Sequence, residues 1–327
     1  MSPTDDGIPA QPLPVAARAP GKCIVFGEHA VVHGAPALVM AIDLETQLFA
    51  RAAPAASLNS DRDAPRENPY FREGLARAWP DGPPLAVRAV SRIPRGAGLG
   101  SSAAFSAALV AALGAATGGM ARRDLAQRAF EVERAAQGVG SPTDTAASVA
   151  GGCIALNGGP GPPIWSVHSD ERDWEVRRIP DPGWVWVVAH SGIRRGTGDQ
   201  VRAVGRRLAS ADGAALLERF RAVARDGIDA VVREDRAAVA GLMRDNQALL
   251  REVGVSHPRL DALLEAAAPA AEAAKITGAG GGGSIVVLPV PGREVDLTRR
   301  LARAGGLPFV VRPAARGAGL VEAAPPP

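Results

Sequence analysis

The chain has 327 residues, of which 46% are hydrophobic and 22% charged, and its 37 basic and 34 acidic residues give a net charge of +3. This balance is typical of a globular protein with one long or two medium domains, and no apolar run approaches the ~20 residues that a membrane span requires. The arginines are scattered and only 4% of residues are aromatic, which argues against nucleic-acid binding and leaves a mild positive field suited to small anionic substrates.

The start of the chain and its two cysteines bear on where the protein works. Residues 1–17 are rich in Pro and Ala and lack the basic start and apolar core of a secretion signal, so they predict a disordered leader. Cys23 and Cys153 each lie in an apolar stretch, which favours two buried thiols over a disulfide or a metal pair. Thiols of this kind predict a cytoplasmic protein.

Hydrophobic patterning predicts mixed strands and helices in the first half of the chain and mainly helices in the second. Strands are expected at residues 23–26, 37–42, 85–93, 152–156, 184–189, 284–289 and 309–312, and helices at residues 101–116, 122–137, 199–209, 214–233, 236–253 and 259–267. This order predicts an α+β protein with two lobes, residues 18–190 and residues 191–327, that divide near His190.

Three glycine-rich segments, spread along the whole chain, carry most of the functional information. They read APGKCIVFGEHAVVHG (19–34), PRGAGLGSSAA (94–104) and KITGAGGGGS (275–284). One such segment would be a turn, but three suggest a fold that brings distant loops together around a phosphorylated ligand. The four consecutive glycines at 280–283 favour close approach of the backbone to a ligand, although a structural turn is the alternative.

The middle segment is the strongest single signal. Gly96, Gly98 and Gly100 lead into a predicted helix, whose free N–H groups and dipole form an anion site. The segment is neither a Walker loop nor a G-x-G-x-x-G dinucleotide motif. Ser102, in the first turn of that helix, can offer a hydroxyl to the Mg²⁺ that accompanies a nucleoside triphosphate, or it can act as the helix N-cap.

Charged side chains near these segments are candidates for catalysis. Lys22 can face a pocket and stabilise a phosphate or an alkoxide, whereas the alternative is a solvated strand end. Glu133 can hold Mg²⁺ or be a solvated helix charge, and Asp144 can act on a hydroxyl proton or cap a helix. For His29 the alternative to ligand contact is a structural histidine.

These strings resemble the GHMP kinase superfamily, whose three motifs occur here in the same order over about residues 19–288. The sequences of these three motifs are similar to those of its mevalonate kinase family. So are the segments SPTDT (141–145), HSGIRRGT (190–197) and GVSHPRLDAL (254–263). The resemblance implies a two-lobed GHMP kinase fold. Its N-terminal lobe would be similar to domain 2 of ribosomal protein S5 and bind the nucleotide, and its C-terminal lobe would be ferredoxin-like and close the active site.

The resemblance also implies roles for individual residues. Asp144 would be the catalytic base or orient the acceptor, Lys22 would stabilise the alkoxide and the transferring phosphoryl group, and Ser102 and Glu133 would hold Mg²⁺. The residues expected to bind ATP are Lys22, Ser91, Arg95, Gly96, Ala97, Gly98, Leu99, Gly100, Ser101 and Ser102. Those expected to bind the acceptor are Glu28, His29, Asp144, Thr277 and Gly278.

The activity implied by the resemblance is phosphorylation of the 5-hydroxyl of (R)-mevalonate by ATP and Mg²⁺, giving 5-phosphomevalonate for isoprenoid biosynthesis. One alternative is a sister kinase acting on phosphomevalonate, on the 3-hydroxyl of mevalonate or on a sugar. Another is a catalytically silent homologue that only binds ligands. The expected partner is a small molecule, neither nucleic acid nor membrane, and a homodimer is an assembly that the resemblance allows.

Overall fold

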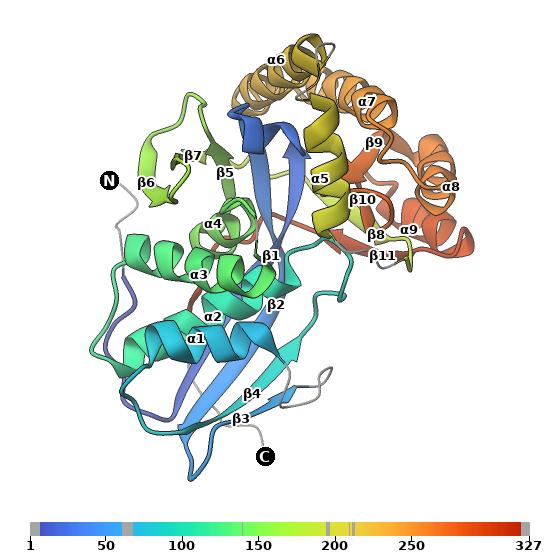
Figure 1. The fold of residues 1–327 in the computed structure, drawn as a ribbon. Coiled ribbons are helices and arrows are strands. Elements are labelled where there is room, and N and C mark those ends of the chain that lie inside the picture. The colour runs from blue at the N-terminus through green and yellow to red at the C-terminus, as the bar shows by residue number, and fades with distance from the viewer. Residues whose placement is uncertain are drawn as a thin grey trace.

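The computed structural model describes residues 7–60, 68–138, 140–193, 197–208, 210 and 213–321 (Figure 1). The first six residues of the predicted leader, and part of the string at 190–197, lie outside the described residues. The described chain forms two β-sheets with helices packed against each, which confirms the predicted α+β class.

The first sheet is built around two long antiparallel strands, β1 (Val15–Phe26) and β2 (Ala37–Ala52), joined by the short 3-10 helix η1 (Ala30–His33). Among the described residues its main strand order is β12-β1-β2-β5-β7-β6, and β4 and β3 branch from β2. The remaining strands are β3 (Ser57–Ser60), β4 (Leu85–Ser91), β5 (Cys153–Leu156), β6 (Pro163–His168), β7 (Asp173–Ile179) and β12 (Gly319–Leu320). Residues 37–40 of β2 pair with β5 and residues 46–52 pair with β4.

Four helices pack beside this sheet, on the left of β1 and β2 in Figure 1, and they are α1 (Pro69–Ala78), α2 (Ser101–Ala116), α3 (Arg122–Gln137) and α4 (Thr143–Ala150). Helix α2 contacts β1, β2 and the other three helices, and every residue from 103 to 115 is buried. A helix that is apolar on all sides belongs in the interior. Its many alanines let the neighbouring elements pack closely, which fixes the position of its N-terminus.

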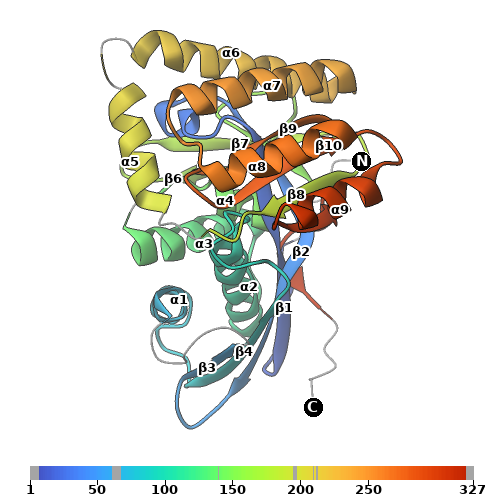
Figure 2. The ribbon, with the colours of Figure 1, turned by 90° about the vertical axis from the view of Figure 1, so that its right-hand side faces the viewer.

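The second sheet has the strand order β11-β8-β10-β9, with antiparallel neighbours throughout. Its strands are β8 (Trp186–His190), β9 (Ala271–Thr277), β10 (Ser284–Pro289) and β11 (Leu307–Val311). The helices of this lobe, seen turned toward the viewer in Figure 2, are α5 (Thr197–Leu208), α6 (Gly213–Val232), α7 (Arg236–Glu252), α8 (Pro258–Ala267), η2 (Ala268–Ala270) and α9 (Glu294–Arg303). Helices between the first two strands and between the last two, with this order, make the lobe ferredoxin-like as predicted.

Two predicted boundaries are wrong. Ile8 is only 4% exposed and pairs with Met120, and β1 begins at Val15, so residues 7–17 belong to the fold and not to a disordered leader. Strand β8, placed by prediction at the end of the first lobe, pairs with β10 and β11 in the second sheet. The lobes therefore divide before Trp186, and the end of the chain returns to the first sheet through β12.

The predicted helices and strands occur in the structure, most of them with ends shifted by a few residues, but β1 and β2 extend well beyond the predicted runs. Helices α1, α4 and α9 and strands β3, β6, β7, β9 and β12 were not predicted. Cys23 and Cys153 are free and buried, as expected. No helix in the described part of the chain is long and apolar enough to cross a membrane.

Candidate active site

The three glycine-rich segments meet at one place, as the sequence predicts. A Cβ atom at Gly21 would lie 2.6 Å from the carbonyl oxygen of Leu99, so the first and second segments approach backbone to backbone. A Cβ atom at Gly278 would lie 3.6 Å from the carbonyl oxygen of Gly98, which places the third segment beside the second. Only glycine permits the first of these approaches, because any side chain at position 21 would collide with the neighbouring backbone.

The peptide groups of the middle segment are oriented by their neighbours. The carbonyl oxygen of Ala97 accepts a hydrogen bond from Ser284 Oγ at 2.7 Å, that of Gly98 from Lys22 Nζ at 2.9 Å, and that of Leu99 from the backbone N–H of Lys22 at 3.0 Å. In a trans peptide the N–H group points opposite to the C=O group. The amides of residues 98–100 therefore face away from these donors, and with the N-terminus of α2 they are a candidate anion-binding nest.

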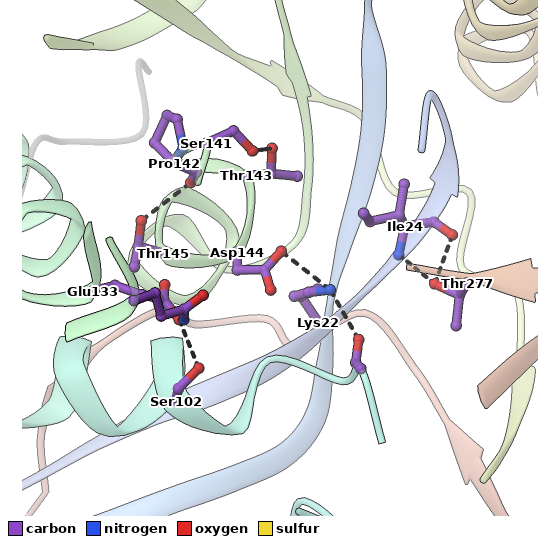
Figure 3. A network of polar contacts seen from close by, with 12 residues as sticks. Lys22, Ile24, Ser102, Glu133, Ser141, Pro142, Thr143, Asp144, Thr145 and Thr277 are labelled. Atoms are coloured by element: carbon purple, nitrogen blue, oxygen red, sulfur yellow. Dashed lines mark hydrogen bonds and ion pairs between the residues drawn. The ribbon is translucent and has the colours of Figure 1, made fainter. Parts of the chain in front are cut away.

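Lys22 lies between this loop and a carboxylate. Its Nζ is 3.1 Å from Asp144 Oδ1, and the Lys22 side chain is only 3% exposed whereas that of Asp144 is 33% exposed (Figure 3). Lys22 is therefore no solvated strand end. Asp144 is in the first turn of α4, but the N-cap of that helix is Pro142 and receives no side-chain cap. The capping alternative for Asp144 is therefore wrong, and its carboxylate is available for chemistry.

Ser102 and Glu133 form a second polar pair next to the loop. Ser102 Oγ donates to Glu133 Oε1 at 2.6 Å (Figure 3), and the N-cap of α2 is Gly100, so the serine hydroxyl is not used as a cap. Glu133 is only 8% exposed, which excludes the solvated alternative. Burial, and then the charge of Asp144, raise the pKa of Glu133 to about 7, and the charge of Lys22 and the hydrogen bonds from Ser102 and Gln137 offset this only in part.

This pair fits the magnesium ion that accompanies a nucleotide. Mg²⁺ prefers hard oxygen ligands, keeps several waters, and is held in nucleotide sites by one or two protein oxygens together with the phosphates. The hydroxyl of Ser102 and the carboxylate of Glu133 supply such oxygens beside the anion-binding nest. Among the described residues, no group of three or more His, Cys, Asp or Glu side chains forms a self-sufficient metal cage.

For the other residues predicted to bind the nucleotide, the structure gives their exposure and their hydrogen bonds within the protein. Arg95 and Gly96 are exposed, and Ser101 is half-buried at the start of α2. The hydroxyl of Ser91 lies 2.9 Å from Thr46 Oγ1 and accepts a hydrogen bond from the N–H of Ile93. Ser91 thus fixes the turn that leads into the loop, and contact between Ser91 and a nucleotide stays a prediction.

Two residues predicted to bind the acceptor are turned into the protein. Thr277 Oγ1 accepts from the N–H of Ile24 at 2.8 Å and donates to the Ile24 carbonyl at 3.0 Å, which joins β9 to β1 (Figure 3). Glu28 forms an ion pair with Lys275, and both side chains are fully buried. Both side chains join the two lobes in this structure, and contact of Thr277 or Glu28 with the acceptor stays a prediction.

The buried pair of Glu28 and Lys275 should contribute to the stability of the fold. Burial raises the pKa of Glu28 and lowers the pKa of Lys275, and the charge of each partner opposes that effect in the other. Replacing one partner leaves the other buried without its counter-charge, so Glu28→Gln or Lys275→Met should each lower the free energy of unfolding by about 3–5 kcal/mol. Denaturant unfolding measures this loss.

The exposed pair of Arg219 and Glu252 provides the control, because Arg219→Gln should cost at most about 1 kcal/mol. The double variant Glu28→Gln with Lys275→Met should lose less stability than the sum of the single losses. Single losses no larger than that of the surface control would contradict a stabilising role for the buried pair.

Burial of His29 should make the stability of the protein depend on pH. Its Nε2 donates to the carbonyl oxygen of Ala279 at 3.1 Å, and burial lowers the pKa of His29 from 6.5 to about 4. The unfolded chain therefore binds a proton at higher pH than the folded chain does. Stability contributed by the neutral ring is present above pH 6.5 and falls by about 3 kcal/mol as the pH drops toward 4.

His29→Asn removes the titrating ring and keeps a side chain that tolerates the positive φ of 62° at this position. The difference in unfolding free energy between wild type and variant should shrink as the pH falls from 6.5 to 4. Parallel pH profiles for the two proteins would contradict the assignment. Contact of His29 with the acceptor stays a prediction.

Three residues near the site had no predicted role. Lys275 was visible as a lone charge opening the third glycine segment, but its partner Glu28 lies 247 positions away in the sequence. Gln137 donates to Glu133 Oε1 at 2.8 Å, and its i,i+4 spacing from Glu133 on one helix was a usable signal. Tyr70 Oη faces Ser102 and Gln137 from helix α1, and no local pattern indicated this.

Comparisons with known proteins show the family of the chain. The N-terminal domain model of the GHMP kinases matches residues 70–152, and the C-terminal model matches residues 228–305. The mevalonate kinase of Methanothermobacter thermautotrophicus is 32% identical over 301 residues, which cover 88% of this chain and 94% of that relative.

Solved structures share the fold across different acceptors. The L. major mevalonate kinase in complex with R-mevalonate has a TM-score of 0.76 at 21% identity, covering 94% of this chain and 100% of that one. Lactococcus lactis galactokinase complexed with galactose has a TM-score of 0.75 at 17% identity, covering 94% of this chain and 95% of that one. These likenesses show the fold alone, whereas the family models and the sequence match show the superfamily and the family. The chain belongs to the GHMP kinase superfamily and, within it, to the mevalonate kinases.

Proposed function

We propose that the protein transfers the γ-phosphoryl group of ATP to the 5-hydroxyl of (R)-mevalonate, giving 5-phosphomevalonate and ADP. The observation that carries the proposal is the position of Lys22, whose ammonium group joins the phosphate-binding loop at Gly98 to the carboxylate of Asp144. Phosphoryl transfer is catalysed mainly by positioning and by electrostatic stabilisation. A buried cation that contacts both the loop and a base suits that chemistry.

Each of these groups has a defined part in the transfer. Asp144 accepts a hydrogen bond from the attacking hydroxyl and takes its proton as the new P–O bond forms, while the bond from the γ-phosphorus to ADP breaks in line. Lys22 stabilises the developing alkoxide and the charge on the transferring phosphoryl group. The amides of residues 98–100 and the N-terminus of α2 hold the polyphosphate in place.

Ser102 and Glu133 would hold Mg²⁺, which neutralises phosphate charge when it is bound. Glu133 supports this assignment because it is a buried carboxylate whose pKa is raised by burial and by Asp144, and a cation would relieve both effects. The two free, buried cysteines support a cytoplasmic location, where thiols stay reduced.

The choice of acceptor rests on sequence and not on fold, since kinases of different acceptors share this architecture. The test is ADP release by the purified protein with ATP and Mg²⁺, using mevalonate, 5-phosphomevalonate, galactose and homoserine as separate acceptors. We expect turnover with mevalonate alone. Turnover with another acceptor alone would contradict mevalonate as the substrate. ATP binding without turnover of any acceptor would favour a catalytically silent binding protein.

A further inference from the structure

The hydrogen bonds to Glu133 are arranged unequally. Ser102 Oγ and Gln137 Nε2 both donate to Oε1, at 2.6 and 2.8 Å. Among the described residues, no hydrogen bond to Oε2 is found. One carboxylate oxygen is therefore fixed by two donors from different helices. Such an arrangement sets the direction of the carboxylate as well as its position.

A third side chain reaches this group from helix α1. Tyr70 is in the first turn of α1, after the N-cap Asn68, and α1 packs against both α2 and α3. Its hydroxyl faces Ser102 and Gln137, the two donors to Glu133. The hydroxyl can therefore hydrogen-bond with these two side chains.

We propose that Tyr70 and Gln137 are positioning residues, which hold Ser102 and Glu133 in the orientation that binds the magnesium ion of the nucleotide complex. The inference rests on the proposed function, because it concerns the same metal-nucleotide site. Neither residue acts on the substrate, and each acts only through the side chains that it contacts. Partners of this kind orient ligands, and their loss commonly weakens metal binding by 10–100-fold.

The structure explains why both residues are needed. Without Gln137, Oε1 keeps one donor and the carboxylate can rotate about its own axis. Without the Tyr70 hydroxyl, Ser102 and Gln137 lose a hydrogen-bond partner, and the serine hydroxyl can turn away from Glu133. Each loss should weaken binding of Mg²⁺ with the nucleotide, while the backbone amides that hold the phosphates stay in place.

The test compares binding of ADP by calorimetry, once with excess Mg²⁺ and once with EDTA, for the wild type, Tyr70→Phe and Gln137→Met. Phe keeps the ring packed on α2 and α3, and Met keeps the length of the side chain without its amide. Arg77→Gln, at an exposed position of the same helix α1, is the matched control. Unfolding temperatures without ligand show whether each variant is folded.

We expect both variants to bind ADP as the wild type does in EDTA, and to lose roughly tenfold of the affinity gained with Mg²⁺. The Arg77→Gln control should keep the full gain. Because Tyr70 is the single tyrosine of the chain, 3-fluorotyrosine labelling gives one ¹⁹F resonance. This resonance should shift more with ADP and Mg²⁺ together than with ADP alone.

Three results would count against the inference, and they are distinguishable. A full magnesium-dependent gain in both variants would overturn the positioning role and leave the proposed function intact. An equal loss of ADP affinity with and without Mg²⁺ would show that the residues only support the fold. Absence of any magnesium-dependent gain in the wild type would overturn the metal site itself, and the positioning role with it.

Discussion

Asp144→Asn is expected to lower the turnover number by about 10²- to 10⁴-fold and to leave ATP binding nearly unchanged. Asn has the size of Asp but cannot accept the proton of the attacking hydroxyl. It also removes the negative charge that lies 3.1 Å from Lys22 Nζ. The proposed phosphate-binding loop accepts hydrogen bonds from Lys22 and Ser284 and none from Asp144, so nucleotide affinity should survive.

Steady-state kinetics with mevalonate, together with calorimetric titration of ATP, separate these two effects. Asp173→Asn is a matched control, since it makes the same change at an exposed position of β7. Near-normal turnover in Asp144→Asn would remove Asp144 from its catalytic role. A large loss of ATP affinity would instead show that Asp144 supports the nucleotide site.

Lys22→Met should lower the turnover number by about 10²- to 10³-fold, because it removes the buried cation that faces the developing charge. Lys22→Arg should also fail, although it keeps the charge. A Cβ atom at Gly100 would lie 2.9 Å from Lys22 Cγ, so the lysine stem already fills the space beside the loop. A planar guanidinium group is too large for this position.

The composition of the chain agrees with this requirement for lysine. Of its 37 basic residues only two are lysines, and these are Lys22 and Lys275. Arginine serves at every other basic position, yet both buried cations at the junction of the lobes are lysines. The ammonium group of lysine is compact enough to be surrounded by backbone atoms, whereas the planar guanidinium group of arginine is not.

The variant carrying both Lys22→Met and Asp144→Asn checks that the two residues act together. Residues that act as a unit show losses that do not add, so the double variant should be much less impaired than the product of the single losses predicts. Strict multiplication of the two effects would contradict a shared role. Full activity of Lys22→Arg would contradict the steric argument.

The elements that the sequence predicted well are those with a clear local signal. Helices α2 and α3 begin and end at the predicted residues because glycine precedes the first and follows the second. Strand β1 is longer than predicted, because it is buried along nearly its whole length and its sequence shows no alternation of polar and apolar residues. Helix α4 was missed because its short sequence, TDTAASVA, is preceded by Gly and Pro.

The part of the candidate site that could be predicted from the sequence is the part formed by the glycine-rich motifs and the charged residues near them. The three glycine segments converge, and Lys22, Ser102, Glu133 and Asp144 meet around them, as their shared chemistry suggested. Glu28 and Thr277 were assigned to the acceptor by the resemblance to the family. Their direction depends on Lys275 and on the backbone of Ile24, which are distant in sequence, so only the packed structure shows that they face inward.

The proton-coupled ³¹P spectrum of the product formed from (R)-mevalonate, ATP and Mg²⁺ tests the central claim most directly. A phosphate on the primary 5-hydroxyl is bonded through oxygen to a carbon with two protons, so its resonance is a triplet. A phosphate on the tertiary 3-hydroxyl has no such protons and gives a singlet. We predict the triplet, together with one ADP for each phosphomonoester. A singlet, or inorganic phosphate as the sole new product besides ADP, would contradict transfer to the 5-hydroxyl.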